Sequence, residues 1–298
     1  MITINTNKIL IPIDFSETSQ RAIKHGAFIA KRNKGELILL HVQRKNELLD
    51  IILPAVNIKD VSVITNFLEE KLEKIAADIS KEYGVPVSAV VSMGNITSEI
   101  VNYANEMNVG LIVMGTQGSD SENDILFLGS NAYRTVTKAD IPVMAVRTVA
   151  ENEGYGNILI PVDTSPHSRQ KVNATLEFAS KFASHVHVLG ILGKDEADYE
   201  YKLKVIIPQI QKLAKEKNLT CTAEIMWDGD FAHLTIAYGE KIKADLIVCM
   251  RDESRDFPRS ILGTYAHTLL NDSKIPVLCI PPEVHPEDLG QDSIGGMW

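Results

Sequence analysis

Two short segments of the sequence combine residue types that can bind a phosphate and a sugar. The first is Pro12-Ile13-Asp14, which ends an apolar run. The second starts at Met114-Gly115 and continues through Gly118 to Gly129-Ser130. Glycine lets the backbone approach a phosphate closely, and exposed N–H groups ahead of a helix bind anions. The Asp14 carboxylate can accept hydrogen bonds from ribose hydroxyls or an adenine amine.

Alternating strands and helices would position these segments. The first half of the chain has short, near-continuous apolar runs separated by helical patterns, which is typical of parallel strands covered on both faces. Right-handed βαβ units then give an open parallel sheet whose ligands lie beyond the carboxyl ends of the strands. The expected strands are Lys8–Ile13, Glu36–Val42, Val85–Ser92, Gly110–Met114 and Val143–Val146, and the helices Glu17–Asn33, Asp60–Tyr83, Thr97–Asn108 and Asn131–Ala139.

The same plan occurs twice in the chain. KILIPID at residues 8–14 matches NILIPVD at 157–163 with an offset of 149, and later matches follow in the same order at offsets of 135 and 134. Such collinear matches indicate an internal repeat. We expect one domain at residues 1–147, a second at 156–281 and a loosely ordered tail at 282–298. The second set of strands is Asn157–Val162, Val186–Leu192, Thr220–Met226, Asp245–Met250 and Pro276–Ile280.

The segment ILIPIDFSETSQRAI, followed by LIVMGTQG and LGSN, resembles the universal stress protein family, and the resemblance covers both halves. It implies two tandem Rossmann-like domains of the adenine nucleotide alpha hydrolase-like type, each an open five-stranded parallel sheet with helices on both faces. It also implies a cytoplasmic stress-response regulator that binds ATP, ADP or AMP, with or without Mg²⁺, and acts through a protein partner. By this resemblance the nucleotide-binding residues are Pro12, Ile13, Asp14, Val42, Met114, Gly115, Gly118, Gly129, Ser130 and Asn131.

Two departures from the family pattern concern the phosphate loop. The pattern Gly-x2-Gly-x9-Gly-Ser/Thr has ten residues here in its long gap, and the loop contains Asp120, Glu122 and Asp124 but no basic residue. Carboxylates repel a triphosphate unless a cation lies between them. We therefore expect AMP or ADP to be held at least as well as metal-free ATP. In the second half Met250 and Glu253 replace the glycines, so any nucleotide is expected in the first half alone.

Bulk composition excludes several classes of partner. The net charge of −9 and pI of about 5.4 leave no basic field for nucleic acid or for an anionic membrane surface. The sequence has no run of 18 apolar residues and no basic leader ahead of its first apolar run, so neither a membrane span nor a signal peptide is expected. Three cysteines without CxxC spacing predict no disulfide framework and no zinc site.

Each candidate residue also has a purely structural interpretation. Asp14 and Asp163 could be helix N-terminal carboxylates, which we favour for Asp163, and the glycines could be turn residues. Ser16 and Ser165 read as helix N-caps rather than nucleophiles. His185 and His187 would share one face of a strand without a third metal ligand. Arg251 and Arg255 read as part of a solvated charge cluster.

Three functions stay open at this point. The first is a regulatory nucleotide-binding protein, and the second is a non-binding interaction scaffold with the same fold. The third is an enzyme, for which the HxGH and SGGxDS signatures of fold relatives are missing, although a slow ATPase with Mg²⁺ in the acidic loop is conceivable. The halves should pair through their last strands, Ile141–Val146 and Ile275–Ile280, as an intramolecular pseudo-dimer. Whether whole chains form a homodimer is open.

Overall fold

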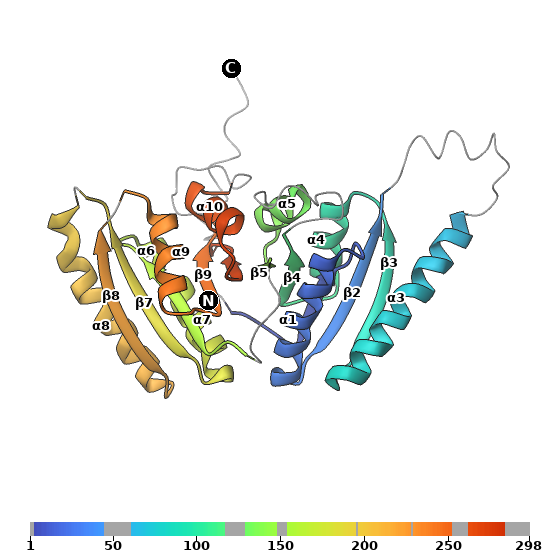
Figure 1. Cartoon of the computed structure of the whole chain (residues 1–298), viewed down its shortest axis with the longest axis horizontal. Helices are drawn as coiled ribbons and strands as arrows, with labels where there is room; N and C mark the ends of the chain where they lie inside the picture. Colours follow the sequence, from blue (N-terminus) through green and yellow to red (C-terminus); the bar gives the residue numbers. More distant parts are fainter. Residues whose placement is uncertain are drawn as a thin grey trace, which may run out of the picture.

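A single ten-stranded sheet runs through the computed structural model, in the order β3-β2-β1-β4-β5-β10-β9-β6-β7-β8 (Figure 1). The structure describes residues 3–44, 61–116, 129–147, 154–194, 196–227, 229–251 and 262–283. Within each half the strands are parallel and are wound in both directions from the first strand, β1 or β6. The chain therefore has the predicted architecture of two tandem Rossmann-like domains with open five-stranded sheets.

The first half matches the expected element order closely. Helix α1 has the predicted bounds, whereas β3 begins only after Pro86, which has no N–H to donate to a sheet. The left-handed backbone of Asn108, with a φ of 53°, follows the end of α4. The elements are β1 (Lys8–Pro12), α1 (Glu17–Asn33), β2 (Glu36–Gln43), α3 (Val61–Tyr83), β3 (Val87–Met93), α4 (Ile96–Glu106), β4 (Leu111–Gly115), α5 (Ser130–Lys138) and β5 (Val143–Val146).

The second half repeats this order with one change near its first strand. A short helix and a longer one, α6 and α7, stand where the first half has the single helix α1. The elements are β6 (Asn157–Val162), α6 (Pro166–Arg169), α7 (Lys171–Phe182), β7 (His185–Leu192), a 3₁₀ turn (Ala197–Tyr199), α8 (Glu200–Glu216), β8 (Thr220–Trp227), α9 (Phe231–Lys241), β9 (Leu246–Met250), α10 (Thr264–Asp272) and β10 (Val277–Ile280).

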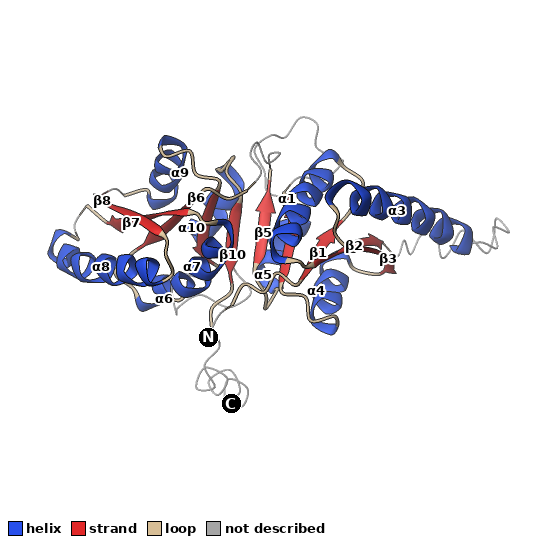
Figure 2. Cartoon of the chain, turned by 90° about the horizontal axis from the view of Figure 1, so that it is seen from below, coloured by secondary structure: helices blue, strands red, loops and turns tan. Residues whose placement is uncertain are grey.

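Helices cover both faces of the sheet and enclose two apolar cores (Figure 2). One core joins the sheet to α1, α3, α7 and α8, and the other joins it to α4, α5, α9 and α10. Strands covered on both faces need apolar side chains in both directions, which is why they read as continuous apolar runs in the sequence.

The two halves pair through β5 and β10, as predicted. These strands run antiparallel, with Leu278 opposite Met144 and Val277 opposite Ala145. The pairing removes the sheet edge that each half would otherwise expose. The predicted intramolecular pseudo-dimer is confirmed.

Arg251 corrects the prediction of a solvated charge cluster. Its side chain is buried, and its Nη1 donates a hydrogen bond of 2.7 Å to the carbonyl oxygen of Ala139 at the end of α5. A guanidinium can be buried only where its donors are paired, and this pairing joins the two halves. Arg255 lies outside the described residues, as do residues 148–153 of the expected linker and 284–298 of the expected tail.

Tyr155 forms a second junction between the halves. Its ring is almost fully buried and packs against Phe178 and Phe182, with centroids 5.5 and 5.2 Å away. Its hydroxyl lies 2.9 Å from Nδ1 of His25 on α1 and 3.3 Å from the sulfur of Met144 on β5. Burial raises the pKa of Tyr155, so the hydroxyl stays protonated. This tyrosine thus links α7 of the second half to elements of the first.

A charged contact between α9 and α10 makes a prediction about pH. His233 Nδ1 lies 2.7 Å from Asp230 and Nε2 lies 3.2 Å from Asp272. The hydrogen bond and charge of Asp230, with Asp272 adding to them, raise the pKa of His233, and the bonds from His233 lower the pKa of Asp230. Because folding raises the pKa of His233, the protonated ring stabilises the folded state. This stabilisation is complete below the pKa of an unfolded-state histidine, about 6.5, and is lost as pH rises through the pKa of His233 in the folded state.

His233→Asn should therefore lower the melting temperature more at pH 6 than at pH 8.5. The asparagine keeps a polar side chain of similar reach but carries no charge. Thermal unfolding of both proteins across this range measures the difference. A difference in melting temperature that stays constant with pH would contradict the stabilising role given to the charge of His233.

Candidate functional site

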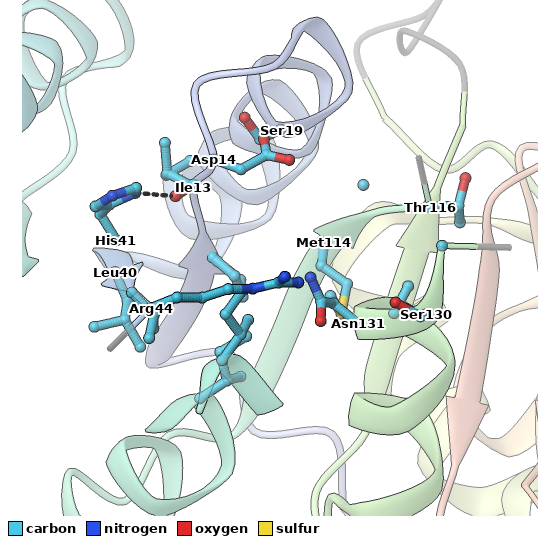
Figure 3. A pocket seen from close by; sticks show the side chains of 17 residues that line it. Ile13, Asp14, Ser19, Leu40, His41, Arg44, Met114, Thr116, Ser130 and Asn131 are labelled. Atoms are coloured by element: carbon cyan, nitrogen blue, oxygen red, sulfur yellow. Dashed lines mark hydrogen bonds between the residues drawn. The ribbon is translucent and has the colours of Figure 1, made fainter. Parts of the chain in front are cut away.

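A cavity of about 300 Å³ opens beyond the carboxyl ends of β1, β2 and β4, where the sheet changes winding direction (Figure 3). Open α/β sheets bind ligands at this switch point. Gly118 lies outside the described residues. All the other site residues predicted from the sequence line the cavity: Pro12, Ile13, Asp14, Val42, Met114, Gly115, Gly129, Ser130 and Asn131.

Asp14 is exposed and closes the turn between β1 and α1. Its Oδ1 accepts hydrogen bonds from the backbone N–H and the hydroxyl of Ser16, at 3.0 and 2.5 Å. Ser16 in turn caps α1 by accepting from the N–H of Ser19, as predicted. Asp163 makes the same bond to the N–H of Ser165, at 2.7 Å, so the turn alone accounts for both aspartates. What separates Asp14 is its place on the cavity wall.

The backbone of this turn is strained in the first half only. Phe15 has a φ of 64°, a region that bulky residues rarely adopt. Its ring lies 4.8 Å from the ring of His41 and 4.0 Å below the ammonium of Lys71. Thr164, the matching residue of the second half, is not in the left-handed region. Strain of this kind persists where surrounding contacts hold it, and it gathers at binding sites.

The end of β4 supplies the opposite wall. A side chain at Gly115 would meet the backbone carbonyl of Thr18 on α1 at 2.8 Å, so the glycine is needed for helix packing as well as for access to the cavity. Thr116, the next residue, is 3% exposed and also lines the cavity. Its hydroxyl Oγ1 has no hydrogen-bond partner within the described residues. A buried hydroxyl without a partner is unusual in a native protein and calls for an explanation.

The N-terminus of α5 faces the same space. The helix begins at Ser130, and its N-cap, Gly129, contributes no side-chain cap. The Gly129 N–H itself is used, because it donates to the carbonyl of Thr116 at 2.5 Å. The donors left for an anion are therefore the first-turn N–H groups from Ser130 onward and the side chain of Asn131.

The structure adds residues that the sequence reasoning missed. His41 lines the cavity and binds the Ile13 carbonyl oxygen through Nδ1 at 2.8 Å. Ile96 and Ile100 of α4 add apolar surface. Arg44 extends from the end of β2 toward Asn131 at the start of α5 (Figure 3). Arg44 was recognisable in principle, because it follows Val42 by two residues at the carboxyl end of a predicted strand.

Larger side chains occupy the corresponding positions in the second half. Met250 and Arg251 occupy the positions of Gly115 and Thr116, and both are buried. Tyr265, at the position of Asn131, lies 2.9 Å from the hydroxyl of Thr235. Glu253 lies outside the described residues.

Two other sequence interpretations concern sites elsewhere. The rings of His185 and His187 stack with centroids 4.2 Å apart, so they do share one face of β7. Across the ranges that the structure describes, no three His, Cys, Asp or Glu side chains gather as a metal site requires. The sulfur atoms of Cys249 and Cys279 lie 3.2 Å apart on the neighbouring strands β9 and β10.

The fold and the cavity define a doubly wound α/β protein with a small-molecule pocket at its switch point. The chain belongs to the universal stress protein family, whose model matches residues 5–147 and again residues 154–281. This membership supports a role in the stress response. Among the described helices, none is both long and apolar enough to cross a bilayer.

Individual relatives agree with the family assignment. Universal stress protein MJ0577 of Methanocaldococcus jannaschii is 32% identical over 159 residues, which are 49% of this chain and 98% of that protein. Universal stress protein YxiE of Bacillus subtilis is 30% identical over 151 residues, 47% of this chain and 99% of its own. The crystal structure of a universal stress protein from Archaeoglobus fulgidus has a TM-score of 0.72 and 19% identity, covering 94% of this chain and 98% of that one. That structure supports the fold.

Proposed function

We propose that the first half binds one adenine nucleotide, ATP, ADP or AMP, without rapid turnover, and that the protein acts through a protein partner in the cytoplasm. In this proposal the nucleotide is a regulatory ligand. The second half completes the pseudo-dimer and contributes no nucleotide site.

The hydroxyl of Thr116 carries this proposal. It is buried, lacks a partner within the described residues and borders the cavity beside Ser130 (Figure 3). Leaving such a hydroxyl unpaired costs about 1–3 kcal/mol. A phosphate oxygen at the start of α5 would accept its hydrogen bond, and the uncapped helix would favour the negative charge.

The remaining walls suit a nucleoside. Ile13, Val42, Ile96 and Ile100 provide apolar surface for a base, and Asp14 presents a carboxylate for ribose hydroxyls. The volume of about 300 Å³ is at the lower end of the range for small-molecule pockets, as a single nucleotide requires. The acidic loop that could hold Mg²⁺, Ser119 to Asp124, lies outside the described residues. When bound there, Mg²⁺ would shield the phosphates from its carboxylates.

A scaffold role suits the second half. The side chains of Met250 and Arg251 are buried at the positions where the first half has Gly115 and Thr116 on its cavity wall. Filling a void in this way improves packing. We therefore assign to this half the alternative function of a non-binding interaction domain.

Replacing Thr116 with Val tests the proposal. The substitution keeps the shape of the side chain and removes the unpaired hydroxyl. Nucleotide affinity should fall about tenfold, corresponding to about 1.4 kcal/mol, while the free energy of unfolding should stay the same or rise, because an unsatisfied buried group is gone. Calorimetric titration and chemical denaturation measure the two quantities.

Thr135→Val is the matched control. Thr135 is also fully buried and its hydroxyl has no partner in the described part of the chain, but it does not line the cavity. Its replacement should leave nucleotide affinity unchanged. Equal affinity losses in the two variants, or an affinity loss in neither, would refute the role given to Thr116.

A further inference from the structure

A second cavity adjoins the first one near the start of α4. Its volume is about 380 Å³, and Arg44, Ile96 and Asn131 line both cavities. The walls that belong to the second cavity alone include Asn95, Thr97 and Arg134. The two cavities are therefore neighbours, and one ligand can extend from the first into the second.

The second cavity is cationic. Arg44 and Arg134 line this cavity from two different elements, the end of β2 and the second turn of α5. Neither guanidinium has an ion pair or hydrogen bond to another residue in the described part of the chain. Two exposed guanidinium groups, neither paired within the described residues, thus border one cavity, and the planar fork of donors on each matches phosphate oxygens.

Two polar side chains beside the arginines already have partners. Asn95 caps α4 by accepting from the N–H and hydroxyl of Ser98, at 3.1 and 3.2 Å. Glu99, which lies against Gly94, accepts from the hydroxyl of Ser92 at 2.6 Å. The arginines and Asn131, rather than the capped N-terminus of α4, thus provide the available binding groups.

The repeat provides an internal comparison. The positions of Arg44 and Arg134 hold Gly193 and Thr268 in the second half, at the offsets of 149 and 134 that align the two copies. The N-cap position of Asn95 holds Asp230, which is engaged with His233. Arg44 and Arg134 thus have no basic counterpart in the second half. The two arginines therefore occur in the half that has the candidate nucleotide site, and the fold that both halves share does not require them.

We infer that this second cavity binds a further phosphate group of the same ligand, held between Arg44 and Arg134. The inference rests on the proposed nucleotide function and narrows its ligand to an adenine nucleotide with more than one phosphate. The extra phosphate comes either from the 5′ chain, as in ATP, or from the other side of the ribose, as in adenosine 3′,5′-bisphosphate. The carboxylates of the acidic loop alone predicted that AMP or ADP would bind at least as well as metal-free ATP. The two arginines, which that reasoning did not include, predict tighter binding of the more highly charged ligand.

Titrations of the whole protein without Mg²⁺, at one ionic strength, test this inference. AMP, ATP and adenosine 3′,5′-bisphosphate are compared on the unmodified chain and on the double variant Arg44→Ala, Arg134→Ala. At least one of the two larger nucleotides should bind ten or more times tighter than AMP, and the double variant should reduce that ratio at least tenfold. Arg169→Ala removes one positive charge at an exposed residue of the second half, half the charge change of the double variant, and should leave the ratio unchanged.

Inorganic pyrophosphate separates this inference from the proposed function. It should bind the unmodified chain and the Arg169→Ala variant, and should lose at least tenfold in affinity on the double variant. Arginine-dependent pyrophosphate binding without any nucleotide binding would sustain the cationic cavity and reject the nucleotide proposal. The inference would be overturned if AMP bound as tightly as both larger nucleotides. It would also be overturned if the double variant changed neither the affinity ratios relative to AMP nor the binding of pyrophosphate. Which larger nucleotide gains affinity identifies the source of the extra phosphate.

Discussion

Asp14→Ala is expected to abolish stoichiometric nucleotide binding, whereas Asp163→Ala should leave it intact. Asp14 lines the cavity and has a second carboxylate oxygen, Oδ2, with no partner in the described ranges. Two ribose hydrogen bonds to a charged acceptor, at about 1.5 kcal/mol each, amount to more than about a hundredfold in affinity. Calorimetric titration of both variants measures the contrast.

The two aspartates are matched controls for one another. Each closes an equivalent turn through a serine N–H, and each replacement removes one negative charge. Asp14→Asn adds a separate arm, because its amide oxygen can still accept from Ser16 while the charge is lost. Nucleotide binding that survives Asp14→Ala, or that disappears only in Asp163→Ala, would contradict the assignment of the site to the first half.

Tyr155→Ala should cause the largest loss of stability of any single change considered. The ring is 2% exposed and contacts Phe178 and Phe182 of α7, while the hydroxyl reaches His25 of α1. Truncating a buried aromatic residue costs about 3–5 kcal/mol. Chemical denaturation should show a fall of that size, and Tyr155→Phe, which removes only the hydroxyl, a fall of about 1 kcal/mol.

Tyr201→Ala is the control for this prediction. Tyr201 lies on α8 and is 62% exposed, so its loss should change the free energy of unfolding by less than about 0.5 kcal/mol. Similar losses for Tyr155→Ala and Tyr201→Ala would show that the junction between the halves does not depend on Tyr155.

The fold could be predicted from the sequence because each of its parts leaves a local signature. Apolar runs such as LILLHV mark strands buried on both faces, and the repeat of KILIPID as NILIPVD fixes the two-domain plan. The capping role of Ser16 follows from its place just ahead of the helix. These features depend on neighbours in the chain, so periodicity and local residue types reveal them.

The details of the site depend on contacts between distant segments. In the sequence Thr116 is an ordinary loop threonine. Only the structure shows that its hydroxyl is buried with no hydrogen-bond partner in the described chain. Arg251 stands among acidic residues in the sequence, yet it binds Ala139 of the other half. Gly115 suggests a phosphate loop, but a side chain there would first meet the backbone of Thr18. No local pattern encodes these contacts, because the folded chain creates them.

The stoichiometry of nucleotide binding tests the central claim most directly. That claim is an asymmetry: the first half has a cavity at Asp14 and Thr116, and the second half has Met250 and Arg251 buried at the matching place. Calorimetric titration of the unmodified chain with ATP, at a protein concentration well above the dissociation constant, should give one nucleotide per chain. Two equivalents per chain would show that the second half also binds and would contradict the account.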